Sequence, residues 1–320
     1  GFGQNKNDEP NPMKGVKTEM ISKYEFEEKF GEFNEILKMK TISTYDSNGN
    51  QVEESVYDSE GSLDDKTIYT YDSNGNQVEE SFYDSDGSLK YKYISKYDTN
   101  GNEVEESNYD SDGDLTNNYI GISKTISRYD SNGNKVEWSR YDSDGSLMWK
   151  TISKYNSNGN KVESSWYNYS DGSLKDKSIS KYDSNGNQVE QTRYDSDGSL
   201  KDKSISKYDS NGNKVERSNY HSDGSIEYKT ISKYNSNGNK VVWSWYDSDG
   251  SSKTIYTYDS NGNKVEESDY DSDGSLNWKY IYKYDTKNRI VELIKYNFGL
   301  KFGQLQQTLT EKHIYEYEEY

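Results

Sequence analysis

One recurring phrase constrains the fold of this chain more than any other feature. Tyr-Asp-Ser-Asn-Gly-Asn occurs ten times with small variations, and a second phrase, Tyr-Asp-Ser-Asp-Gly-Ser-Leu, lies between consecutive copies. The tyrosines of the first phrase stand at positions 45, 71, 97, 129, 155, 182, 208, 234, 258 and 284, so most spacings are 26 residues. Each unit has two turn phrases and two intervening runs, which predicts one β-hairpin per unit.

The chemistry of the turns and of the runs between them supports this prediction. Asn-Gly and Asp-Gly favour tight hairpin turns, because glycine adopts a positive φ without strain. The runs, such as residues 150–155, are rich in β-branched and aromatic residues, and both prolines, Pro10 and Pro12, precede the first repeat. We therefore expect an all-β antiparallel meander of about ten 26-residue hairpins.

Two loop lengths are compatible with the repeat, and they place the side chains differently. Two-residue loops would put Tyr45 and Tyr57 on opposite faces of the sheet. Three-residue loops, with glycine in the left-handed position, are favoured because they separate an aliphatic face from a tyrosine face. The aliphatic set is then Ile42, Val52 and Ile68, and the opposite set is Tyr45, Tyr57, Leu63 and Tyr71.

The strand lengths predict a constant slide along the sheet. With two-residue loops a strand of ten residues is followed by one of twelve, and either loop length gives the same slide, so each hairpin shifts by two residues relative to the preceding one. A slide in one direction, added to the natural twist, curls a sheet into a coil or barrel-like spiral. The expected fold is a twisted spiral or solenoid-like ribbon (a β-solenoid) with degenerate end caps.

The repeats define four regions. Residues 1–15 form a polar tail, 16–44 a degenerate capping unit, 45–286 the tandem repeats and 287–320 a degenerate, more apolar segment. Apolar end units leave an open sheet edge that favours strand addition. The expected assembly contacts are Phe2, Phe26, Phe30, Phe33, Ile290, Leu293, Ile294, Phe298, Phe302, Ile314, Tyr315 and Tyr317.

The composition fits a sheet better than a conventional globular core. Leu, Ile, Val and Phe together number 50, and the net charge is -18, but there are 33 Tyr and 6 Trp and no Ala. Such few aliphatic residues can stripe a long sheet held by tyrosine rings and cross-strand pairs such as Glu79 with Lys92. The negative charge argues against nucleic-acid partners and membrane insertion, and the absence of Cys excludes disulfides and thiolate chemistry.

The chain shows little that would support catalysis or metal binding. His221 and His313 are its two histidines, neither lies beside a nucleophile motif, and we expect no enzyme activity and no cofactor. The repeated Asp-x-Asp-Gly, as at 142–145, places glycine too early for a calcium loop of the EF-hand type. A turn stabilised by side-chain to backbone hydrogen bonds is favoured, with a weak calcium ion shared between adjacent turns left open.

Some positions vary between repeats, and the tryptophans cluster late in the chain. The residue before the second tyrosine reads Val56, Phe82, Asn108, Arg140, Trp166, Arg193, Asn219, Trp245 and Asp269, which is typical of positions facing solvent or a partner. Rows of aromatic residues beside Asp and Asn could bind glycans, or could simply pack within the sheet. The tryptophans are Trp138, Trp149, Trp166, Trp243, Trp245 and Trp278, and Asn168 begins an N-glycosylation sequon.

The residues 69–76, Tyr-Thr-Tyr-Asp-Ser-Asn-Gly-Asn, resemble the core of YD repeats, the Rhs-like family of bacterial surface and toxin-delivery proteins. They are also similar to the hairpin arrays of secreted bacterial proteins that lack a known enzyme domain. The resemblance covers about residues 40–290 and implies long β-ribbons that spiral, sometimes into hollow shells. No distinct C-terminal effector domain follows the repeats here, so the resemblance implies fold and surface location rather than activity.

These observations lead to two functional hypotheses. The first is a non-enzymatic extracellular or bacterial cell-surface protein that assembles with itself, head to tail, into a filament through its terminal strands. The second is a cell-surface adhesin or carbohydrate-binding module that uses its Tyr and Trp rows on glycans. Either would require export, with a signal peptide that is absent from this chain and already removed.

Overall fold

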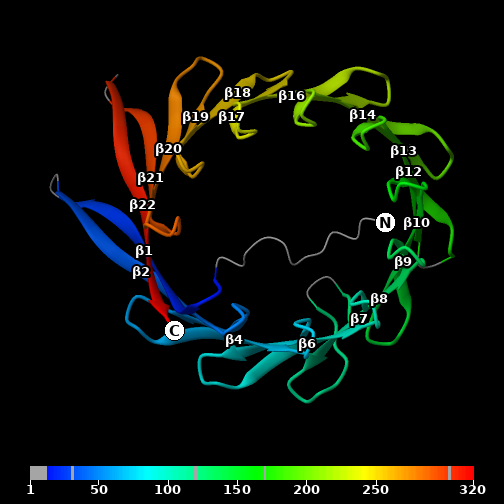
Figure 1. Cartoon of the computed structure of the whole chain (residues 1–320), viewed down its shortest axis with the longest axis horizontal. Coiled ribbons are helices and arrows are strands. Elements are labelled where there is room, and N and C mark those ends of the chain that lie inside the picture. Colours follow the sequence, from blue (N-terminus) through cyan, green and yellow to red (C-terminus); the bar gives the residue numbers. More distant parts are fainter. Residues whose placement is uncertain (1–12, 30–31, 119–120, 169–170, 302–303) are drawn as a thin grey trace.

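The computed structural model describes residues 13–29, 32–118, 121–168, 171–301 and 304–320. Their strands form one antiparallel sheet of 22 strands in which each strand pairs with the next along the chain. The last strand also pairs with the first, with Ile21 opposite Tyr315, so the sheet closes into a barrel (Figure 1). The expectation of an open spiral or solenoid-like ribbon is therefore wrong.

The strands alternate in direction around the barrel. Their bounds are β1 (Val16–Lys29), β2 (Glu32–Tyr45), β3 (Gln51–Tyr57), β4 (Leu63–Tyr71), β5 (Gln77–Asp84), β6 (Leu89–Tyr97), β7 (Glu103–Asp110), β8 (Lys124–Tyr129), β9 (Lys135–Tyr141), β10 (Leu147–Tyr155), β11 (Lys161–Asn168), β12 (Leu174–Tyr182), β13 (Gln188–Asp195), β14 (Leu200–Tyr208), β15 (Lys214–His221), β16 (Ile226–Tyr234), β17 (Lys240–Asp247), β18 (Ser251–Tyr258), β19 (Lys264–Tyr270), β20 (Leu276–Tyr284), β21 (Ile290–Lys301) and β22 (Gln304–Glu319).

The register confirms the predicted slide of two residues per hairpin. Thr41 lies opposite Val56, which in turn lies opposite Asp65. The residue that corresponds to Thr41 in the next repeat is Thr67, two residues beyond Asp65. Nine such steps lead from β2 to β20. The return from β20 to β2 through β21, β22 and β1 adds four residues, so the total slide around the barrel is 22 residues. The total slide therefore equals the number of strands in the barrel.

This geometry makes the barrel wide. A slide averaging one residue per strand tilts the strands by about 35° and gives a backbone radius of about 20 Å for 22 strands. Side chains extend only about 6–7 Å from each wall, so they cannot fill a barrel of more than about eight strands. The barrel therefore surrounds a wide lumen, along which Figure 1 is viewed.

The turns confirm three-residue loops, with one feature that the sequence did not reveal. The Asp46 amide donates to the Asn50 carbonyl across the loop, and Gly49 has a φ of 83°. A β-bulge beside each such turn adds one residue to the following strand, so Tyr57 lies opposite Lys40 and shares the face of Ile42. The predicted separation of an aliphatic face from a tyrosine face is therefore wrong, because the bulge reverses the parity of Tyr57.

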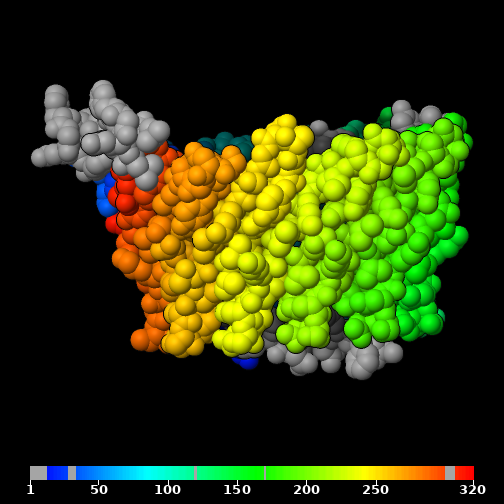
Figure 2. All heavy atoms as spheres, turned by 90° about the horizontal axis from the view of Figure 1, so that it is seen from above, coloured from blue at the N-terminus to red at the C-terminus, as the bar shows by residue number. Residues whose placement is uncertain are grey.

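The direction of the backbone amides shows which face lines the lumen. The amides of Asp72 in one turn and Asp84 in the next both donate toward the following strand. Viewed from outside, the chain advances from right to left, and β1 begins at the lower rim, so even-numbered strands run downward (Figure 2). In strands of L-residues this places Asp72 and Ile68 on the outer face, and Asp84 and Phe82 on the lumenal face.

The outer face carries a ladder of charge pairs. Glu163 contacts both Lys154 and Lys177 at 2.8 Å, and Glu190 contacts Lys181 and Lys203 at the same distance. The predicted pair of Glu79 with Lys92 also forms, at 3.5 Å. Each exposed pair stabilises the sheet only slightly, so the ladder fixes register more than it provides stability.

The repeated tyrosines join neighbouring hairpins. The hydroxyl of Tyr208 donates to the carbonyl oxygen of Gln188 at 2.9 Å, twenty residues earlier. Equivalent bonds are made by Tyr71, Tyr97, Tyr129, Tyr155, Tyr182, Tyr234, Tyr258, Tyr284 and Tyr317. Because Val16, Tyr45 and Ile122 are the only buried apolar side chains among the described residues, these bonds replace much of what a core provides elsewhere.

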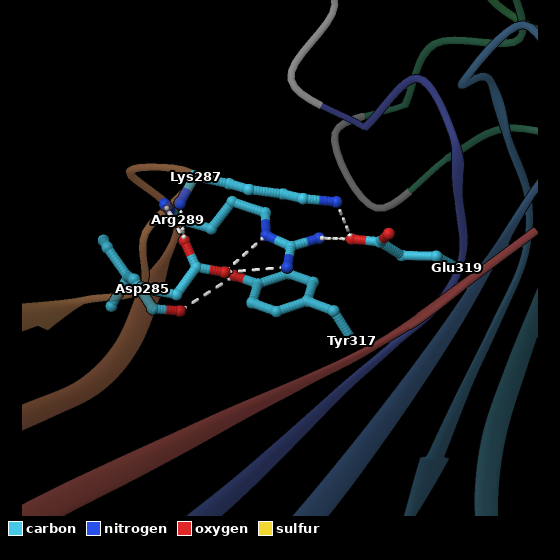
Figure 3. Close-up of polar contacts among 6 residues, drawn as sticks. Asp285, Lys287, Arg289, Tyr317 and Glu319 are labelled. Atoms are coloured by element: carbon cyan, nitrogen blue, oxygen red, sulfur yellow. Dashed lines mark hydrogen bonds and ion pairs between the residues drawn. The ribbon is translucent and has the colours of Figure 1, made fainter.

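An ionic cluster joins the two ends of the chain (Figure 3). Arg289 stands where other repeats have asparagine, and it contacts Asp285 of its own turn at 2.7 Å and Glu319 of β22 at 3.0 Å. Its guanidinium lies 4.3 Å from the centre of the Tyr317 ring, and Lys287 also pairs with Glu319. The departure of residues 287–289 from the repeat is thus explained by closure of the barrel.

Candidate lumenal binding site

All six tryptophans lie on the lumenal face. Trp138 and Trp166 flank Thr151, which is the repeat equivalent of the lumenal Thr67, and Trp149 lies opposite Arg140. The register of β16 with β17 and of β19 with β20 places the other three on the same face: Trp243, Trp245 and Trp278. The position that varies most between repeats therefore faces the lumen, which explains why equivalent hairpins differ there.

The structure brings three of the tryptophans together and separates the others. Trp138, Trp149 and Trp166 lie on the consecutive strands β9, β10 and β11. Trp245 instead packs near Tyr228, with ring centres 6.4 Å apart, and Trp278 packs edge-on against Tyr280 at 5.2 Å. Packing within the sheet thus accounts for Trp245 and Trp278, whereas two of the first three, Trp138 and Trp149, flank a charged residue.

That residue is Arg140, which sequence analysis did not single out as a site. Its guanidinium carbon lies 3.9 Å from the centre of the Trp138 ring and 5.3 Å from that of Trp149. Burial lowers the pKa of the Arg140 side chain, and the charge of Glu106 partly opposes this shift. The signal in the sequence was the variable position before the second tyrosine, which does not show which residue type would matter.

Buried polar atoms without partners occur on the lumenal face, and two of them, on Arg140 and Thr151, lie beside these tryptophans. Among the described residues there are three such side-chain atoms: Asn108 Oδ1, Arg140 Nε and Thr151 Oγ1. Asn108 and Thr151 are only 4% and 8% exposed. Each unsatisfied buried group costs about 1–3 kcal/mol, so this part of the wall is not optimised for its own stability.

A hollow of about 490 Å³ opens in the wall beside this group. Two of the three tryptophans form part of its lining, and an ion pair closes one side, because Arg193 holds Asp202 through two contacts of 2.8 and 2.5 Å. The lining residues are Met148, Trp149, Trp166, Tyr167, Asn168, Lys175, Asp176 and Arg193. We call the lumen-facing residues of this lining (Trp149, Trp166, Asn168, Asp176 and Arg193), together with Trp138 and Arg140, the lumenal site.

A row of carboxylates follows the lumenal face on the N-terminal side of the site. Burial raises the pKa of Glu80 and of Glu106, and the neighbouring Glu54 and Glu103 respectively add to these shifts. Burial also raises the pKa of Tyr69 to about 12, with Glu54 and Glu80 contributing. The lumen therefore changes around its circumference from carboxylate-rich hairpins to tryptophan- and arginine-rich ones.

The other predicted sites are distributed as follows. His221 lies exposed at a turn, and His313 contacts Glu311 on β22. The Asn168 amide donates to Ser173 Oγ at 3.2 Å, while the other two residues of its sequon lie outside the described residues. In the Asp-x-Asp-Gly turn at 142–145, Asp142 Oδ1 accepts hydrogen bonds from the backbone amides of Asp144 at 3.1 Å and Ser146 at 2.8 Å, which confirms the predicted turn role of this aspartate.

Half of the expected assembly residues lie in the barrel wall, and the others lie elsewhere or outside the described residues. Six lie on β21 and β22, which pair with each other and with β1 in the barrel wall: Ile290, Leu293, Ile294, Ile314, Tyr315 and Tyr317. Phe26 and Phe298 lie on hairpins that continue beyond the last β1–β22 pair, Glu25 opposite Glu311. Phe2, Phe30 and Phe302 lie outside the described residues, and Phe33 lies opposite Glu28 in the first hairpin.

No three His, Cys, Asp or Glu side chains of the described residues form a group that could hold a metal ion. The described part of the chain also contains no helix that is long and apolar enough to cross a membrane.

Comparisons with known proteins identify no family. No protein-family model matches the chain, and no curated protein matches it. Solved structures that share some likeness include a complex of TcdB2, TccC3 and Cdc42 (13% identity over 81% of this chain, TM-score 0.32) and a Photorhabdus luminescens Tc holotoxin pore (12% over 85%, TM-score 0.30). A third is a porin-like protein from Bacteroides uniformis (12% over 97% of this chain and 100% of that one, TM-score 0.31).

The chain spans no more than a fifth of the length of the two toxin chains, 17% and 20%. At TM-scores of this size, none of these likenesses identifies the fold or the function of this protein. The resemblance to YD repeats stays a prediction.

Proposed function

We propose that the protein is a non-enzymatic binding barrel whose lumenal site holds a carbohydrate. The observation that carries this proposal is the coincidence of three indole rings with unsatisfied polar atoms on one stretch of the lumenal face. Sugars present apolar C–H faces that stack on aromatic rings and hydroxyl groups that both donate and accept hydrogen bonds. This combination matches a site with few polar groups set among aromatic side chains.

The outer face supports a barrel that is surrounded by water. Charged side chains on a lipid-facing barrel surface cost about 2–4 kcal/mol each at mid-membrane. The outer face instead presents the Glu163 and Glu190 ladders at the middle of its strands. We therefore infer a secreted or surface-attached protein whose ligand binds inside the barrel.

The test is a glycan array followed by calorimetry on the intact barrel. Trp149→Ala and Trp166→Ala should each weaken binding at least about tenfold, the loss expected for a central aromatic contact. Trp278→Ala is the matched control, since this tryptophan is also lumenal but packs against Tyr280 away from the hollow. The proposal fails if no glycan binds, or if the control weakens binding as much as the other two variants.

Assembly into a filament is a second candidate, and one observation favours it. The hairpins β1–β2 and β21–β22 diverge beyond their shared pairing (Figure 1), so residues 26–29 and 304–310 pair with a neighbouring strand on one side only. Such edges accept an added strand. Electron microscopy of the concentrated protein should show end-to-end chains if this contact forms, and single barrels at every concentration would contradict it.

A further inference from the structure

Arg140 is an unmatched positive charge in a strongly acidic protein. The chain has a net charge of -18, yet no carboxylate oxygen lies within 4 Å of Arg140 among the described residues. The Arg140 guanidinium lies instead against two indole rings, those of Trp138 and Trp149. The other arginine of the lumenal site, Arg193, holds Asp202 in a two-pronged ion pair.

The carboxylates beside the hollow are held by other cations, and the one carboxylate that acts on Arg140 does not contact it. Asp176 is already held by Lys201 at 2.8 Å, and Asp202 is held by Arg193. Glu106 faces Arg140 across the intervening strand β8, two strands away, and acts on it only through space. The site thus combines matched ion pairs at one end with a single unmatched guanidinium between aromatic rings at the other.

A guanidinium in this setting is suited to one kind of group. Its planar N–H donors match a carboxylate in a two-pronged contact, and the flanking rings both hold the plane and exclude water. The same indoles offer stacking surfaces for a sugar ring bearing that carboxylate. An uncharged hydroxyl would leave the charge of Arg140 unmatched.

We propose that the lumenal site selects an acidic saccharide, with a uronic-acid carboxylate bound by Arg140 and a sugar ring stacked on Trp149. This inference rests on the proposed carbohydrate function and names its ligand class. Because the net charge of the protein repels polyanions at long range, the ligand carries isolated acidic sugars between neutral ones. Binding should therefore weaken as the number of charged sugars per chain rises.

The test uses a glycan array containing pairs of oligosaccharides that differ only in one sugar, neutral in one member and the corresponding uronic acid in the other. The native barrel should bind the uronic-acid member at least about tenfold more tightly, as expected for a charge-assisted contact. Arg140→Gln should abolish this preference, so that the two members bind with affinities within about twofold of each other. Arg140→Lys should keep part of the preference.

Arg128→Gln serves as the control, because this arginine is exposed on the outer face beside Glu137 at 3.8 Å. It should leave both affinities unchanged. Equal binding of the two members, or a preference that survives Arg140→Gln, would overturn the inference while leaving the carbohydrate function intact. Failure to bind either member of any pair would overturn both.

Discussion

Hydroxyl bonds of the repeated tyrosines join hairpin after hairpin around the barrel, and Tyr208→Phe tests one of them. The substitution removes the bond of 2.9 Å to the Gln188 carbonyl and leaves the ring in place. Because the bond is only partly buried, its loss should cost about 0.5–1 kcal/mol, the lower part of the range for neutral hydrogen bonds. Ten such bonds would then contribute about 5–10 kcal/mol, comparable to the whole stability of a typical domain.

The assay is urea unfolding followed by tyrosine and tryptophan fluorescence. Tyr208→Phe should lower the unfolding midpoint without changing the slope, since the native surface is unaltered. Tyr220→Phe is the matched control, because its hydroxyl has no hydrogen-bond partner among the described residues, and its midpoint should stay close to that of the native protein. A loss in Tyr208→Phe no larger than in Tyr220→Phe would refute the structural role assigned to the repeated tyrosine.

Three further predictions concern pH, the seam and the turns. Since the pKa of Tyr69 is raised to about 12, its contribution to the free energy of unfolding is complete below pH 10 and is lost as the pH rises toward 12. Tyr69→Phe should flatten this loss when urea unfolding is measured across that pH range. An unchanged pH profile would contradict the prediction. Arg289→Asn restores the usual turn residue but removes the contact with Glu319. Amide hydrogen exchange in β1 and β22 should therefore become faster, while exchange in β12–β14 stays unchanged. The control Arg128→Asn should alter exchange in neither region. Gly274→Ala should lower the free energy of unfolding by about 1–2 kcal/mol, because φ at this position is 84° and an added Cβ would meet no atom within 4 Å. Gly274→Asn should cost less, since asparagine tolerates this left-handed conformation better than alanine. Equal losses in the two variants would rule out a backbone origin of the effect.

Local features of the fold could be predicted because they depend on neighbouring residues. Glycine at position 49 and its equivalents determines the three-residue loops, and the lengths between turns determine the two-residue slide. The bulges could not be predicted, because they come from the pairing of whole strands rather than from one residue type. A bulge beside each turn placed Tyr57 on the face opposite to the expected one.

Closure depends on contacts that are distant in the sequence. A spiral and a barrel share the same slide, and they differ only in whether the last strand meets the first in register. The unusual residues Lys287 and Arg289 marked the place, but their partner Glu319 lies about thirty residues later on another strand. For the same reason the sequence indicated that position 140 varies, without indicating that it faces a lumen between two tryptophans.

The central claim is that β1 and β22 pair, and a disulfide tests it directly because the chain has no cysteine of its own. Ser22 and Ile314 are directly opposite each other across this seam, where Cα atoms lie about 4.5–5.5 Å apart, within reach of a disulfide. Ser22→Cys with Ile314→Cys should cross-link within one folded molecule under mild oxidation. Ser22→Cys with Ile281→Cys on β20, three strands away, should not. Free thiols in the first pair, or a cross-link only between molecules, would show that the sheet is open.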